Sequence, residues 1–139
     1  MDTSCCIAAL LSESGASATV LNLVLEGKLC NFYTKEIGEE IKKVIARPKF
    51  NLEQEKQEHF LHLFKEASFQ IQPSEAYQVK ECRDPQDDKF LSLAQQIEAD
   101  VLITIDNDLL TLKKTGKTRI MIPSEFLEFL KEERRGEEC

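Results

Sequence analysis

Short, mostly apolar segments alternate with longer amphipathic ones along this chain, and that alternation constrains the fold more than any other feature. The clearest apolar segment is 101–105, and three more lie at 29–33, 69–71 and 119–122. Each has the length of a strand and is mostly apolar, as strands buried on both faces are. Strands that alternate with helices predict an α/β fold built on a mostly parallel sheet.

The segments between these strands carry helix signals. Thr34 is typical of an N-cap, and Pro48 ends the helix that follows it. The predicted helices cover residues 16 to about 26, 34–46, 52–67, 87–97 and 125–131. The length of 139 residues suits one domain, which we place at 1–131, followed by a charged tail at 132–139 that we expect to be frayed.

Composition narrows the function classes. The net charge of -7 argues against a passive nucleic-acid-binding module, because such modules carry a basic surface. It does not argue against an enzyme whose acids hold metal ions, since a bound cation reverses the local field. No apolar run approaches the roughly 18 residues of a membrane span. The five cysteines are odd in number and scattered, which indicates reduced thiols. We therefore expect a cytoplasmic protein with no membrane partner.

Four acids are predicted to lie at one edge of the sheet. Right-handed crossovers bring the carboxyl ends of parallel strands to the same edge, where ligands bind in open α/β sheets. Asp106 directly follows the segment 101–105, and Asp87 begins a helix after a turn. Glu40 lies in the first half of the helix after 29–33, and Asp2 stands at the head of the chain.

Each of these acids also has an ordinary interpretation. Asp87 suits an N-cap, Glu40 a solvated helix face, and Asp106 and Asp108 a turn. Their convergence on one edge favours a site instead. Clustered carboxylates repel one another, and a hard cation such as Mg²⁺ or Mn²⁺ resolves the conflict. The chain has no glycine-rich phosphate loop and no Gly-x-Ser-x-Gly elbow, which disfavours a nucleotide-binding protein or a serine hydrolase.

Several short motifs occur in an order and spacing that are fairly specific together. They are Asp2-Thr3-Ser4, Gly15-Ala16-Ser17, Glu39-Glu40, Arg47-Pro48-Lys49-Phe50, Arg83-Asp84-Pro85-Gln86-Asp87-Asp88-Lys89-Phe90-Leu91, Leu102-Ile103-Thr104-Ile105-Asp106-Asn107-Asp108 and Ile122-Pro123-Ser124-Glu125-Phe126-Leu127. Across essentially its whole length the chain thereby resembles the PIN-domain family, metal-dependent nucleases that include the toxin components of toxin–antitoxin pairs.

The resemblance implies a three-layer α/β/α fold and an Mg²⁺- or Mn²⁺-dependent endoribonuclease. Its catalytic, metal-binding acids would be Asp2, Glu40, Asp87 and Asp106. Asp88 is the alternative for the third acid, Asp108 a possible auxiliary to the fourth, and Thr104 matches the threonine that orients the fourth acid. RNA is the implied substrate, and a small antitoxin protein and a second copy of the chain are implied partners.

Two departures from the family pattern stand at the start of the chain. Ser4 occupies a position where the family usually has asparagine. The family also has an apolar central strand before its first acid, whereas only Met1 precedes Asp2. Either the start lies upstream or the first strand is truncated, which would leave Asp2 poorly held. These departures motivate the alternative function, a degenerate PIN domain that binds a protein without catalysis.

Overall fold

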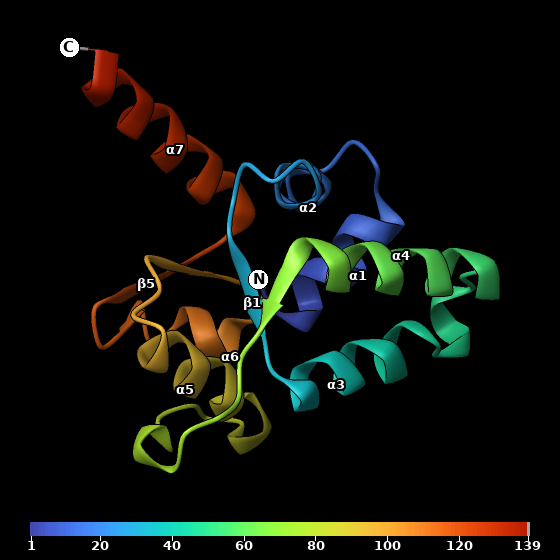
Figure 1. Ribbon diagram of the computed structural model, residues 1–139, viewed down its shortest axis with the longest axis horizontal. Helices are drawn as coiled ribbons and strands as arrows, with labels where there is room; N and C mark the ends of the chain where they lie inside the picture. Colours follow the sequence, from blue (N-terminus) through green and yellow to red (C-terminus); the bar gives the residue numbers. More distant parts are fainter. Residues whose placement is uncertain (139) are drawn as a thin grey trace.

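The structure is a computed structural model that describes residues 1–138, with side chains to Arg134. Helices dominate it, and short strands lie between them (Figure 1). The helices are α1 (Thr3–Leu11), α2 (Ala16–Leu25), α3 (Lys35–Ile45), α4 (Gln54–Ala67), α5 (Asp88–Gln96), α6 (Asn107–Leu110) and α7 (Pro123–Glu138), with 3₁₀ turns η1 (Pro48–Phe50), η2 (Glu75–Tyr77) and η3 (Pro85–Asp87). The strands are β1 (Asn31–Tyr33), β2 (Ser68–Gln70), β3 (Val101–Ile103), β4 (Lys114–Thr115) and β5 (Thr118–Met121).

The strands form two small sheets. β1 pairs in parallel with β2, and β3 pairs in parallel with β5, which also pairs antiparallel with β4. The predicted α/β class with mostly parallel pairing is therefore confirmed. The expected single central sheet is wrong for the described residues, because no strand joins β1 to β3. All four predicted strands form, although β1 and β3 are two residues shorter than their apolar segments.

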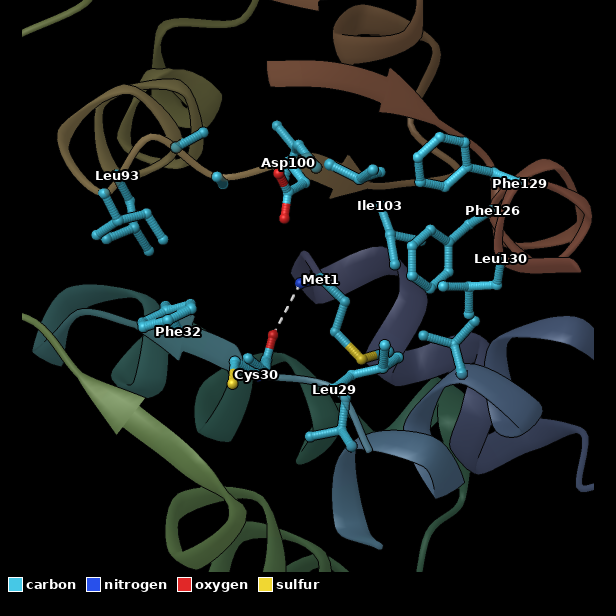
Figure 2. Close-up of a pocket in the computed structure, with 18 of the residues that line it drawn as sticks. Met1, Leu29, Cys30, Phe32, Leu93, Asp100, Ile103, Phe126, Phe129 and Leu130 are labelled. Carbon is cyan, nitrogen blue, oxygen red and sulfur yellow. Dashed lines mark hydrogen bonds between the residues drawn. The ribbon is translucent and has the colours of Figure 1, made fainter. Parts of the chain in front are cut away.

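An apolar cavity of about 700 Å³ separates the two sheets. In Figure 2 Phe32 and Leu93 line one side of it and Phe126 lines the other, with Met1 between β1 and β3. The α-amino group of Met1 donates to Asn31 Oδ1 at 3.0 Å. The backbone N–H of Asp2 donates to the carbonyl of Ile103 at 3.0 Å. The first two residues thus connect the facing sheet edges at one end of the cavity.

The helices largely follow the sequence signals. Thr34 caps α3 through Oγ1, which accepts from the N–H of Ile37 at 3.2 Å, and α3 ends before Pro48 as predicted. The last helix differs: α7 runs to Glu138 instead of ending at Lys131. Glu, Lys and Arg are good helix formers, so a charged composition does not end a helix. Of the predicted tail, Cys139 lies outside the described residues.

Packing on two buried clusters holds the sheets and helices together. The larger includes Ile37, Ile41 and Ile45 on one face of α3, and the smaller joins Val20, Ile103 and other residues to α7. Among the described helices, none is by itself long and apolar enough to cross a membrane. Only α1 and α2 taken together reach that length and apolar composition, and the two helices are bent by 103° relative to each other. The described cysteines are free thiols.

Candidate metal centre

Asp2 is the most firmly held of the predicted acids. Its side chain caps α1 by accepting from the N–H of Cys5 at 3.1 Å, and the same oxygen accepts from Ser4 Oγ at 2.7 Å. Its other oxygen accepts from Thr104 Oγ1 at 2.5 Å. Only 3% of the residue is exposed. Burial raises the pKa of Asp2, while these hydrogen bonds counteract part of that effect.

The expectation that Asp2 would be poorly held is therefore wrong. A helix cap and two hydroxyls fix its carboxylate without a preceding strand. Ser4, at the position where the family usually has asparagine, also contacts the segment after β3, since its hydroxyl accepts from the N–H of Ile105 at 3.2 Å. Thr104, fully buried, also accepts from the N–H of Asp106 at 2.9 Å. The residue after β3 and the start of α1 are thereby fixed to each other.

Glu40 lies in the middle of α3 with both carboxylate oxygens engaged. One oxygen accepts from Thr3 Oγ1 on α1. The other forms an ion pair with Lys89 Nζ on α5 at 2.7 Å. Glu40 thus ties three helices together, and the solvated-helix interpretation does not describe it.

Asp87 and Asp106 meet directly. Asp106 caps α6 by accepting from the N–H of Asp108 at 2.9 Å, and its carboxyl lies close to that of Asp87. Burial and the adjacent Asp106 carboxyl raise the pKa of Asp87 to about 7, and Asp84 adds to the effect. Two carboxyls this close repel each other when both are ionised, and no cation of the protein fully offsets that repulsion at Asp87.

A third and a fourth acid adjoin this pair. One carboxylate oxygen from each of Asp84, Asp87 and Asp108 lies within 4.8 Å of the others. Asp84 caps the turn η3 and Asp87 is its last residue, and residues three apart in a 3₁₀ turn lie on the same side of it. Asp108 also forms an ion pair with Arg83 at 3.0 Å.

Asp84 was missed by the sequence interpretation, which treated 83–87 as a plain turn. The available signal was an acid, a proline and a second acid at a spacing of three, since proline favours the first position of a helical turn. Lys89 was also missed as a functional residue. Its signal was a lone cation among acids in the segment 84–89.

The structure distinguishes the two candidates for the third acid by their surroundings. Asp88 accepts from the backbone N–H of Cys82 at 2.8 Å and so stabilises the loop before η3. Asp87 faces Asp106 instead. The four predicted acids lie at one edge but do not form one tight group. Asp87 and Asp106 are in contact, and Asp2 and Glu40 are joined to them through Thr104 and Lys89.

The donor set fits a hard divalent cation. Carboxylate oxygens are the ligands that Mg²⁺ and Mn²⁺ prefer, and at least three can approach a common point here. The raised pKa of Asp87 marks the place where positive charge is lacking. Asp2, by contrast, has its charge compensated by donors. The cavity between β1 and β3 is lined by neither Asp87 nor Asp106 and is a separate feature.

Comparison with known proteins identifies the family of the chain. Residues 1–108 match the family model described as a PIN domain. The chain is 30% identical over 139 residues to the uncharacterized protein MJ1680 of Methanocaldococcus jannaschii, an alignment that covers 92% of this chain and 88% of that protein. No solved structure matches. PIN domains are generally nucleases that bind divalent metal. With its family model covering most of the described residues, the chain belongs to the PIN-domain family.

Proposed function

We propose that this chain is an Mg²⁺- or Mn²⁺-dependent endoribonuclease that acts in the cytoplasm. The observation that carries the proposal is the close approach of the Asp87 and Asp106 carboxyls beside the further acids Asp84 and Asp108. Repulsion within such a pair lowers the stability of the fold, whereas two adjacent carboxylates attract a bound cation. Membership of the PIN-domain family supports the nuclease class.

In this proposal Asp87 and Asp106 hold the cation, with Asp84 or Asp108 beside them and Asp2 and Glu40 at the margin of the site. A bound divalent cation lowers the pKa of a water and neutralises phosphate oxygens. Thr104 keeps Asp106 in register with Asp2, since its hydroxyl contacts both residues. A cation held there would favour the ionised form of Asp87, because carboxylates bind metal when deprotonated.

The test is cleavage of a panel of RNAs by the purified protein in Mn²⁺. We expect cleavage by the wild type and its loss in Asp106→Asn and Asp87→Asn. Asp100→Asn is the matched control, because Asp100 is an exposed acid at the opposite end of β3. If all four proteins show the same background cleavage, the proposal is wrong. A parallel panel of DNA substrates defines the substrate class.

We further propose that the chain is the toxin component of a toxin–antitoxin pair, restrained by a small antitoxin protein and active as a homodimer. The segments 83–91 and 102–108 resemble motifs of the PIN-domain family, which includes the toxin components of such pairs, and this resemblance supports the step. Expression of the wild type without a partner would then arrest growth, whereas Asp106→Asn would not. Equal growth of both strains would contradict it, and sedimentation velocity measures the dimer.

The alternative is a PIN domain that binds a partner protein without catalysis. The cavity between β1 and β3 favours this reading, since neither facing edge is paired among the described residues and an extended peptide can add to such edges. Calorimetry with Mn²⁺ separates the two functions. Binding that Asp87→Asn abolishes favours the nuclease, and no binding to the wild type favours the protein-binding module.

A further inference from the structure

Lys89 holds an unusual place among the cations of this protein. It is the second residue of α5, and its side chain is only 13% exposed. Its ammonium lies 2.7 Å from Glu40 Oε1 and also donates to the carbonyl of Gln86, next to Asp87. The other ion pairs of the described residues join side chains that are at least 39% exposed. The pair of Lys89 and Glu40 is the one shielded from solvent.

The charges around Lys89 are mostly negative. Glu40 is its ion-pair partner, and Asp84, Asp87 and Asp88 lie within five residues of it along the chain. Glu40 has no oxygen free of a donor, since Thr3 engages one and Lys89 the other. A divalent ion that approaches Glu40 therefore meets an ammonium already bound at the oxygen that faces α5.

We propose that Lys89 has two roles at the candidate metal centre. In the absence of metal its ammonium occupies Glu40 and competes with the divalent ion for that carboxylate. Once displaced from Glu40, the ammonium contacts a phosphate oxygen of the substrate. The second half of this proposal rests on the proposed nuclease function, and the first half does not. Lysine suits both roles, because a compact ammonium on a flexible stem can exchange one oxygen partner for another without changing its charge. A fixed structural ion pair would do neither.

The two roles predict effects of opposite sign, which a structural role does not. In Lys89→Met the competitor is gone, so Mn²⁺ should bind more tightly by about tenfold, in keeping with the one to three pKa units by which a nearby opposite charge alters a carboxylate. RNA cleavage at saturating Mn²⁺ should nevertheless fall by about tenfold or more, because a charge-assisted contact to phosphate is lost. Lys89→Arg keeps the charge and should retain most of the cleavage.

The experiment is calorimetry with Mn²⁺ alone on the full chain, followed by cleavage assays. Lys117→Met is the control for net charge, since Lys117 is exposed in the β4–β5 turn. Tighter Mn²⁺ binding in Lys89→Met but not in the control supports competition, and unchanged or weaker binding overturns it. Lys89→Gln replaces Lys89→Met if the latter does not fold.

A double substitution locates the competition. In a Glu40→Gln background, Lys89→Met should no longer tighten Mn²⁺ binding, because the shared carboxylate is gone. An equal tightening in both backgrounds would contradict competition at Glu40. The calorimetric result does not depend on RNA. Absence of cleavage by the wild type would therefore refute the nuclease proposal and the phosphate role, while leaving competition decided by metal binding alone.

Discussion

Asp2 and Asp87 are the same residue type at the same edge of the fold, yet their carboxyls are in opposite circumstances. Asp2 is 3% exposed and accepts hydrogen bonds from two hydroxyls and a backbone N–H. Asp87 is partly exposed and faces the carboxyls of Asp106 and Asp84. Burial raises both pKa values, but donors oppose the shift at Asp2 and acids increase it at Asp87. The protein itself therefore compensates the charge of Asp2, and we propose that a divalent cation compensates the charges of Asp87 and Asp106.

The largest effect on stability is expected from a substitution at Asp2. Asp2→Ala removes the cap of α1 and leaves Thr104 Oγ1 and the N–H of Cys5 without their acceptor, which should lower the free energy of unfolding by about 3 kcal/mol. Urea unfolding measures it. A loss below about 1 kcal/mol would mean that Asp2 contributes no more to the stability of the fold than Asp87 does.

The matching change at Asp87 should not lower the free energy of unfolding. Asp87→Asn relieves the repulsion from Asp106 and Asp84, so in metal-free buffer the protein should be as stable as the wild type or slightly more so. Its affinity for Mn²⁺ should fall by at least about tenfold, because one charged ligand is lost; tenfold corresponds to about 1.4 kcal/mol. If Asp87→Asn loses stability and keeps its affinity for Mn²⁺, Asp87 is a structural residue and not a metal ligand.

The pH dependence of stability distinguishes the same two acids. Because the folded pKa of Asp87 is raised to about 7 from 3.8, the folded state holds more protons than the unfolded state between those values. Metal-free stability should therefore fall as pH rises from about 4 to about 7 and level off above that. Asp87→Asn should flatten part of this fall, with urea midpoints at about pH 5 and about pH 8 as the measurement. An identical slope in the wild type and the variant would contradict the assigned pKa.

The smallest effect separates the adjoining acids. Asp88→Asn removes an acceptor from the N–H of Cys82, so it should cost about 1 kcal/mol of stability. Its affinity for Mn²⁺ should stay within about twofold of the wild type, because the Asp88 carboxylate is engaged in the loop. A tenfold loss would instead make Asp88 the third acid.

Some of this arrangement could be read from the sequence. The apolar run at 101–105 with acids after it specified β3 and Asp106, and the cap and stop signals specified α3. The sequence could not show how many sheets form, because pairing depends on which edges meet. It also could not show that Asp84 joins Asp87 across η3, or that Lys89 reaches Glu40 from another helix. Those contacts link segments that are adjacent only in the folded chain.

In the proposed site the pair of Asp87 and Asp106 lacks positive charge until a divalent cation binds. The decisive measurement is a carbon-detected NMR titration of the two carboxyls, without and with Mg²⁺. One carboxyl should have a pKa near 7 in metal-free protein, and that pKa should fall clearly when Mg²⁺ is added. A titration that Mg²⁺ leaves unchanged, or an ordinary pKa for both carboxyls in metal-free protein, would contradict the proposed cation site.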